Sequence, residues 1–86
     1  MTWIVQVARA ARKQFARFPA KDQKKIAAAL QALAEDPFSG DIIKLEGAES
    51  RWRRRVGNYR IFLTINSATM TVAVSSIARR TSTTYR

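Results

Sequence analysis

The apolar positions follow two different periods along the chain, and each period predicts a different kind of element. From Trp3 to Val7 every second residue is apolar, which predicts a β-strand over residues 2–7. In residues 8–18 the apolar side chains recur at steps of three and four, which predicts a short amphipathic helix. Pro19 disfavours helical backbone in the residue before it, so this helix is expected to end there.

A second and longer helix is predicted over residues 21–35. Ile26, Leu30 and Leu33 recur at helical spacing, and the alanines between them favour helix and permit close packing. The pattern ends at Asp36-Pro37. Because the two helices are so close in the chain, we expect an antiparallel helix hairpin that covers an apolar surface supplied by the second half of the protein.

The second half of the chain predicts β-structure. Residues 51–56 and 59–66 flank Gly57-Asn58, a pair that can take positive φ in a two-residue turn, so these segments are expected to form a β-hairpin. Residues 70–77 are expected to form a further strand after a short turn at 66–69.

These elements predict a single domain of the α+β class over residues 1–86. Their order is β-α-α-β-β-β, with the helix hairpin packed on one face of a mainly antiparallel sheet. Residues 37–50 are expected to be a connecting loop, with Ile42, Ile43 and Leu45 as apolar anchors.

The predicted hairpin also determines which side chains share a face. Val56 lies opposite Tyr59 and Arg55 opposite Arg60, and the faces alternate along each strand. One face carries Arg54 among the apolar residues Trp52, Val56, Tyr59, Ile61, Leu63 and Ile65. The other face, called the arginine face below, carries Arg51, Arg53, Arg55 and Arg60 beside Phe62 and Thr64.

The register of the strand at 70–77 depends on one pairing. If Ile65 pairs with Met70, then Met70 joins the apolar face, while Ile77 and Arg79 lie on the arginine face. Arg80 then points the other way. A single β-bulge would exchange the faces of Arg79 and Arg80.

The distribution of charge predicts the kind of partner. The chain has 86 residues and a net charge of +10; all six acidic residues lie before position 50, and the eight basic residues after it are all arginines. A surface built only for solubility mixes signs, so this half predicts a polyanionic partner: nucleic acid, an acidic protein segment or a membrane surface.

The arginine face favours nucleic acid among these partners. Like charges directly opposite one another destabilise a sheet, so folding alone does not favour this arrangement. Guanidinium groups suit bidentate contacts to phosphate, and Phe62 offers a surface on which a base can stack. The plainer alternative is a basic face that only docks an acidic protein.

The composition excludes several kinds of chemistry. With no Cys and no His, the chain has no disulfide, no cysteine- or histidine-ligated metal and no Ser-His-Asp or Cys-His catalytic group. No apolar run approaches the roughly 18 residues of a membrane span, and the N-terminal residues are not in the order of a signal peptide.

Four segments resemble, in order and spacing, the bacterial RelE/ParE toxin superfamily: KLEG at 44–47, WRRRVGNYRI at 52–61, IARR at 77–80, and Tyr85. The block at 52–61 is the most specific of them, and the resemblance extends over nearly the whole chain. It implies a cytoplasmic toxin of a type II toxin–antitoxin pair, whose protein partner is a cognate acidic antitoxin.

In the RelE branch, the toxin enters the ribosomal A site beside the 16S rRNA and cuts translated mRNA. The RNA 2′-hydroxyl attacks the adjacent phosphate without a metal or cofactor and leaves a 2′,3′-cyclic phosphate. The resemblance thus implies a metal-independent endoribonuclease. Its implied catalytic residues are Arg53, Arg55, Arg60, Arg79 and Tyr85, and its implied RNA-binding residues are Lys44, Arg51, Phe62 and Arg80.

Arg53 and Arg55 depart from the family pattern, in which one or both positions are lysine. A lysine whose pKa is lowered can act as a general base, whereas arginine stays protonated and clamps a phosphate or stabilises the transition state. We therefore expect Arg60 and Arg79 to clamp the scissile phosphate, and Tyr85 to orient the base or assist proton transfer.

The identity of the base and the reaction itself have open alternatives. Glu46 and Glu49 are the nearest carboxylates in the sequence and are alternative bases. The ParE branch shares the fold but inhibits DNA gyrase through protein contacts; retention of the arginines and Tyr85 argues against it. A nucleic-acid-binding relative without turnover is the third possibility.

Overall fold

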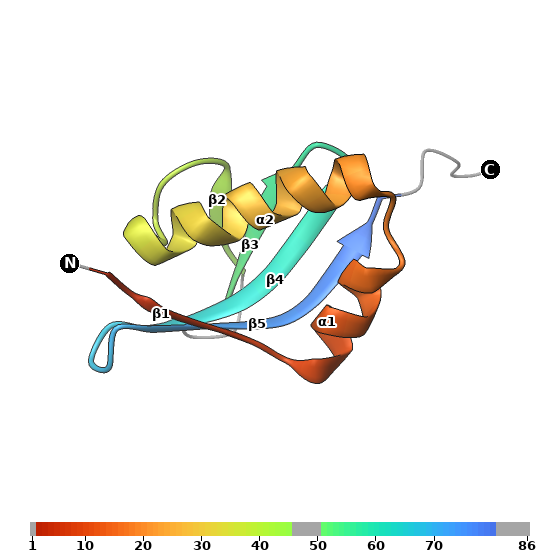
Figure 1. Cartoon of the computed structure of the whole chain (residues 1–86). Coiled ribbons are helices and arrows are strands. Elements are labelled where there is room, and N and C mark those ends of the chain that lie inside the picture. Colours follow the sequence, from red (N-terminus) through yellow and green to blue (C-terminus); the bar gives the residue numbers. More distant parts are fainter. Residues whose placement is uncertain (1, 46–50, 81–86) are drawn as a thin grey trace.

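Two helices and five strands make up the part of the chain that the computed structural model describes, residues 2–45 and 51–80 (Figure 1). In chain order they are β1 (Ile4–Val7), α1 (Arg9–Ala16), α2 (Ala20–Glu35), β2 (Ile42–Lys44), β3 (Arg51–Val56), β4 (Tyr59–Asn66) and β5 (Thr71–Arg79). The α+β class and the predicted order are confirmed, with one strand added.

The strands form a single mixed sheet in the order β1-β5-β4-β3-β2. β1 is parallel to β5, and the other neighbouring strands are antiparallel. The prediction that residues 42–44 lie in a loop is wrong, because they pair as β2 with Trp52–Arg54 of β3. This pairing satisfies backbone groups on the outer edge of β3 that a loop would leave open.

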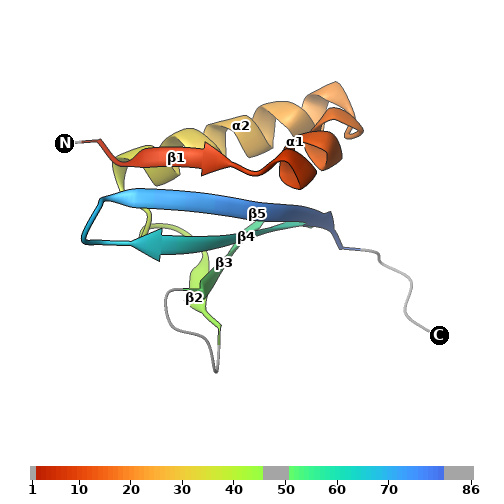
Figure 2. The same ribbon diagram turned by 90° about the horizontal axis from the view of Figure 1, so that it is seen from below.

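Both helices lie on one side of the sheet, and within residues 2–45 and 51–80 no helix covers the other side (Figure 2). Ala11 of α1 is completely buried, and its small side chain lets α1 approach β5 closely. The Oε1 atom of Gln14 accepts a 2.6 Å hydrogen bond from the backbone N–H of Ile77, which ties α1 to β5.

The turn between the helices begins earlier than predicted, because α1 ends at Ala16. The side-chain amide of Gln23 donates a 3.0 Å hydrogen bond to the carbonyl of Phe15 and satisfies one of the free carbonyls at the end of α1. Phe18 follows the helix and packs against Tyr59, with 4.5 Å between the ring centroids.

The core lies between the helices and the sheet, and burial of this apolar surface is the main force that holds the two layers together. The buried residues are Ala11, Ile26, Ala29 and Leu33 from the helices, and Tyr59, Ile61, Leu63, Ile65, Val72, Val74 and Ile77 from the strands. The apolar face predicted for the hairpin is thereby confirmed.

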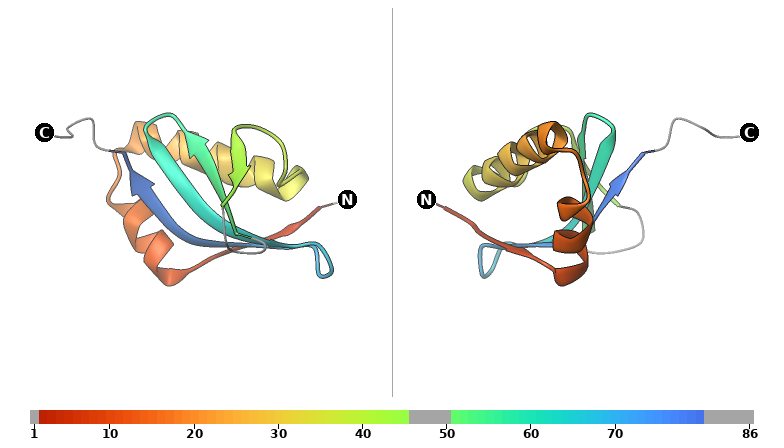
Figure 3. Two further views of the ribbon diagram at one scale, coloured as in Figure 1. Left: turned by 180° about the vertical axis from the view of Figure 1, so that it is seen from behind. Right: turned by 45° about the vertical axis from the view of Figure 1, so that its right-hand side comes forward.

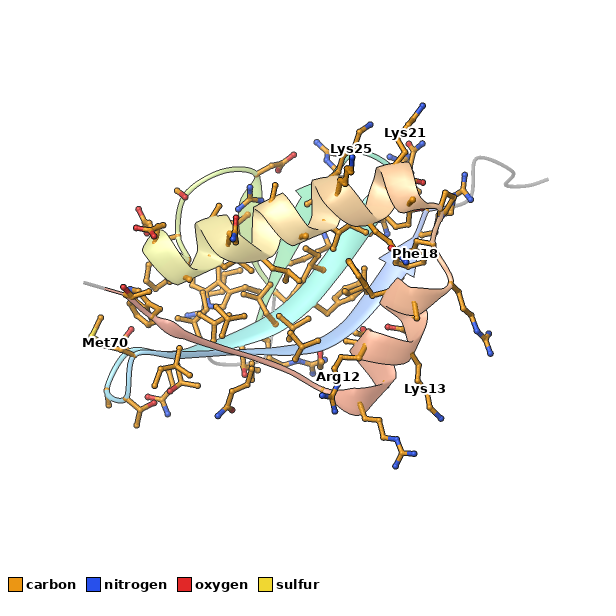
Figure 4. All side chains as sticks on the ribbon, viewed as in Figure 1. Arg12, Lys13, Phe18, Lys21, Lys25 and Met70 are labelled. Carbon is orange, nitrogen blue, oxygen red and sulfur yellow. The ribbon has the colours of Figure 1, made fainter. Side chains whose placement is uncertain are left out.

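The start of β5 is shifted by two residues from the predicted register. Asn66 pairs with Thr71 and Ile65 with Val72, so the turn occupies residues 67–70, and the predicted pairing of Ile65 with Met70 is wrong. A shift of two leaves the faces of Val72 and Val74 unchanged, because side chains alternate with a period of two. Met70 lies at the turn outside the core (Figure 4).

A β-bulge then changes the faces of the residues that follow. Leu63 pairs with Val74 and Phe62 with Ser76, so Ser75 is an extra residue. Its hydroxyl donates a 3.1 Å hydrogen bond to the carbonyl of Phe62. As a result Ile77 is buried in the core, and its expected place on the arginine face is wrong.

Candidate nucleic-acid interface

The arginine face lies over β3 and β4, on the side of the sheet that the described helices leave uncovered. Figure 3 (left) shows these strands from that side. The pairing of β3 with β4 follows the predicted register at every position, with Arg55 opposite Arg60 and Arg53 opposite Phe62. Arg51 lies opposite Thr64. Because paired residues point to the same side of a sheet, the structure brings these four arginines and Phe62 together.

β2 extends this surface by one strand. Ile43 pairs with Arg53, so Ile43, Arg53 and Phe62 form a row across three strands on the helix-free side. Ile43 is 46% exposed, and the other two are half-buried. Sequence reasoning missed this contribution of Ile43 because residues 37–50 carry no clear strand signal of their own.

Arg55 has an acidic partner that sequence reasoning did not identify. Its Nε donates a 2.9 Å hydrogen bond to Oδ2 of Asp41, and its backbone N–H donates to the Asp41 carbonyl at 2.8 Å. Both side chains are about half exposed, at 50% and 54%. The carboxylate offsets some of the repulsion between Arg55 and Arg60, which face each other across the strands.

Arg60 contains an unsatisfied donor at the centre of the face. Its Nε is buried and has no hydrogen-bond partner among the described residues. Arg55 and Ala78 are its neighbours on β3 and β5. A buried donor without an acceptor is unfavourable. The Nε atom of Arg54, on the opposite side of β3, is likewise buried and without a partner among the described residues.

Arg54 points to the opposite side of β3 and fastens the loop before β2. Its Nη1 donates a 3.1 Å hydrogen bond to the carbonyl of Ser39. Its guanidinium lies so close to Gly40 that a Cβ there would stand 2.6 Å from Cζ of Arg54, and Gly40 has φ +83. This contact explains the one charged residue on the apolar face of the hairpin.

Arg79 does not lie on the arginine face. The bulge in β5 places it opposite Tyr59 on the other side of the sheet, with its Cζ 5.9 Å from the Tyr59 ring centroid. There it borders a cavity of about 110 Å³ together with Asp22, Lys25 and Asn58. The expectation that Arg79 shares a face with Arg60 is therefore wrong.

Tyr59 is buried and takes part in packing, as predicted for an aromatic residue on the apolar face. Its hydroxyl donates a 2.6 Å hydrogen bond to Oδ2 of Asp22. This hydrogen bond, together with burial and the negative charge of Asp22, raises the pKa of Tyr59 above its ordinary value of 10.0, and the positive charge of Arg79 opposes that effect.

The other predicted site residues fall in three places. Arg80 follows β5, and its backbone N–H donates to the carbonyl of Asn58, so the alternation of the strand returns Arg80 to the side of Arg60. Lys44 is exposed and pairs with Trp52, away from the arginine face. Tyr85, Glu46 and Glu49 lie outside the described residues.

A second group of basic side chains lies on the helix layer. Lys21 and Lys25 extend from α2 away from the sheet, and Arg12 and Lys13 extend from α1 (Figure 4). These four side chains are exposed and form no ion pair within residues 2–45 and 51–80. The two layers of the protein therefore both present positive charge to the solvent.

The described part of the chain offers no cluster of three or more acidic or metal-binding side chains that could hold a metal ion. Neither of the helices in that part is long and apolar enough to cross a membrane.

Sequence comparison establishes the class of protein. The family described as "ParE toxin of type II toxin-antitoxin system, parDE" matches residues 5–82. The chain therefore belongs to this family and is a toxin of a type II toxin–antitoxin system, within the RelE/ParE superfamily. No curated protein sequence matches the chain.

Solved structures of the superfamily share the fold. The RelE–RelB complex of the archaeon Pyrococcus horikoshii OT3 is similar with a TM-score of 0.83 at 23% identity, over 96% of this chain and 100% of that one. The RelBE2 complex of Mycobacterium tuberculosis has a TM-score of 0.81 at 20% identity, over 93% and 100%. A YoeB/ParE toxin from Agrobacterium tumefaciens has 0.75 at 16% identity, over 91% and 99%.

Proposed function

We propose that this toxin is a metal-independent endoribonuclease that cleaves mRNA at the ribosomal A site and thereby inhibits translation. The observation that carries the proposal is the arginine face, where four arginines lie on the helix-free side of two adjacent strands. Same-face residues on a strand stand about 7 Å apart, a spacing suited to successive phosphates of an extended RNA strand. Phe62, in the middle of the face, offers a stacking surface for a base.

Within this surface, Arg55 and Arg60 are the best placed to clamp the scissile phosphate, because they lie directly opposite each other. This assignment replaces the expected pairing of Arg60 with Arg79. Arg79 contacts the RNA only from the end of the sheet, and Arg53 and Arg51 hold the flanking phosphates in our proposal.

The proposed reaction follows from what arginine can and cannot do. The 2′-oxygen attacks the adjacent phosphorus as its proton passes to a base. The bond to the 5′-oxygen of the next nucleotide then breaks, that oxygen takes up a proton from water, and a 2′,3′-cyclic phosphate remains. Guanidinium groups stabilise the negative charge on the pentacoordinate phosphorane, but they do not accept the 2′-hydroxyl proton at neutral pH. We assign to Tyr85 the role of orienting the base or assisting that proton transfer, with Glu46 and Glu49 as the candidate bases.

The partner and compartment in this proposal are those of the family. An acidic antitoxin neutralises the protein by covering its positive surface, and the solved relatives from Pyrococcus horikoshii and Mycobacterium tuberculosis were crystallised with antitoxins. The proposed RNA partners are mRNA and the 16S rRNA that surrounds the A site, so the toxin acts in the cytoplasm. Arg80 is a proposed further RNA contact on the side of Arg60. Lys44, which pairs with Trp52 on the opposite side of the sheet, is not assigned a contact with that RNA strand.

A second candidate function is inhibition of DNA gyrase through protein contacts. The observation that favours it is the matching family itself, which is described by its ParE members. The two candidates make different demands on the surface, because cleavage requires the arginine face, whereas gyrase inhibition does not.

The deciding experiment is controlled induction of the protein in bacteria, followed by mapping of mRNA 5′ ends. Wild type is expected to give new ends in phase with the reading frame, and Arg60→Ala is expected to abolish them. Arg12→Ala, which removes the same charge from the helix layer, is the matched control and keeps the cuts. Growth arrest with DNA damage and no new ends would instead support gyrase, and the absence of any effect would support binding without turnover.

A further inference from the structure

We propose that Asp41 is a positioning residue for Arg55, and this inference rests on the proposed RNA-cleaving function of the arginine face. The Asp41 carboxylate holds the guanidinium by its Nε–H and leaves the two terminal amino groups of Arg55 available to a phosphate. Asp41 itself does not contact the RNA in this proposal.

Backbone hydrogen bonds hold Asp41 beside Arg55, independently of the contact between their side chains. The Asp41 carbonyl accepts a 2.8 Å hydrogen bond from the backbone N–H of Arg55, and the N–H of Ile42 donates to the Gly40 carbonyl at 3.0 Å. The backbone and the carboxylate of Asp41 therefore both bond to the same residue of β3, Arg55.

The loop that carries Asp41 is also held from the other side of β3. Arg54 donates to the carbonyl of Ser39 and fills the space at Gly40. At its start, Oδ1 of Asp36 accepts a 3.0 Å hydrogen bond from the N–H of Phe38. Arg54 and Arg55 thus contact the same short loop from opposite faces of β3, which limits how far Asp41 can move.

The charges around Arg55 explain why such a partner is useful. Arg60 faces Arg55 directly, and two unpaired guanidinium groups in this position repel each other. The carboxylate contacts only Nε, one of five N–H donors of the guanidinium. An exposed ion pair of this kind adds little to folding stability, so its main effect is on the orientation of the Arg55 side chain.

The position of Asp41 predicts that removing its carboxylate lowers the rate of cleavage without lowering the affinity for RNA. Asp41→Ala frees the guanidinium, so the single-turnover cleavage rate of a bound oligoribonucleotide is expected to fall about tenfold. Asp41→Asn keeps an oxygen acceptor for Nε–H and is expected to stay within about threefold of wild type. Both variants lose one negative charge, so their affinity for RNA is expected to be unchanged or higher.

Glu35→Gln is the matched control. It removes one exposed carboxylate at the end of α2, outside the proposed interface, and should change neither the rate nor the affinity. If Asp41→Ala cleaves as fast as wild type, or if the alanine and asparagine variants are equally slow, Asp41 does not position Arg55 through a hydrogen bond.

A second measurement does not depend on cleavage. In the ¹⁵N spectrum of the free protein, the Nε–H of Arg55 is expected to give a distinct signal that Asp41→Asn retains and Asp41→Ala loses. The signal should persist when an uncleavable 2′-O-methyl oligonucleotide binds. Absence of the signal in wild type, or its displacement by the oligonucleotide, would overturn the proposal. By contrast, an inactive wild type with the signal intact would contradict the nuclease function alone.

Discussion

The hydroxyl of Tyr59 donates a 2.6 Å hydrogen bond to Oδ2 of Asp22 and thereby joins the start of β4, the central strand of the sheet, to the first turn of α2. Phe18 packs on the same tyrosine ring, and Cζ of Arg79 lies 5.9 Å from the centroid of that ring. This one side chain connects the turn between the helices, the start of α2 and the end of β5. The connection has consequences for stability that are separate from the proposed RNA site.

Removal of the hydroxyl should weaken the contact between the layers. Tyr59→Phe keeps the ring and its packing but leaves the Asp22 carboxylate without its donor. We expect the midpoint of thermal unfolding to fall by roughly 4–8 °C, the shift that corresponds to one hydrogen bond in a domain of this size. The midpoint should fall less in Asp22→Asn, which keeps an acceptor. An equal fall of the midpoint in both variants would contradict this explanation.

The raised pKa of Tyr59 makes the same contact sensitive to high pH. In the unfolded chain the tyrosine ionises near its ordinary value of 10.0, whereas in the folded protein the neighbouring Asp22 keeps it protonated. The stability contributed by the protonated form is therefore complete below pH 10 and is lost as the pH rises through the folded pKa.

Absorbance titration near 295 nm measures this shift. The chain has two tyrosines, so a Tyr85→Phe background leaves the signal of Tyr59 alone. Its midpoint should lie above that of the urea-unfolded protein, and Asp22→Asn should move it back toward the unfolded value. A midpoint equal to that of the unfolded chain would show that Asp22 does not bond to Tyr59.

Gly40 should tolerate substitution less well than Gly57. Both have positive φ, +83 and +57, but a Cβ at Gly40 would meet the Arg54 guanidinium at 2.6 Å, whereas nothing lies within 4 Å of a Cβ at Gly57. Gly57→Ala should cost about 1–2 kcal/mol for backbone strain alone. Gly40→Ala should cost at least about 1 kcal/mol more in urea unfolding, and adding Arg54→Ala should recover part of that difference.

RNA affinity should depend on salt in a way that identifies the face in contact. Binding of single-stranded nucleic acid weakens with salt with a slope of about 0.7 for each phosphate neutralised. Arg53→Ala should therefore lower the slope by about 0.7 in fluorescence anisotropy titrations with a short uncleavable oligonucleotide. Arg12→Ala on α1 serves as the control of equal charge, and an equal change in both variants would mean that the contact is not confined to the arginine face.

Local sequence patterns were sufficient for the helices, the β3–β4 hairpin and its register. The two-residue turn determines which residues pair, and apolar alternation determines which face is buried. The shared face of Arg51, Arg53, Arg55 and Arg60 therefore follows from the sequence alone. The turn itself differs in one detail: Gly57 has positive φ but Asn58 does not, as in a type II′ turn.

Only the tertiary structure decided the features that depend on distant segments. β2 forms because β3 needs a partner at its outer edge, and the bulge at Ser75 arises because burial of Ile77 outweighs regular pairing. The break between Val74 and Ile77 in the apolar period was the one local signal of that bulge. The contact between Asp41 and Arg55 has a similar origin. The loop after α2 must return to the sheet edge, and no local sequence pattern predicts the position of the Asp41 carboxylate.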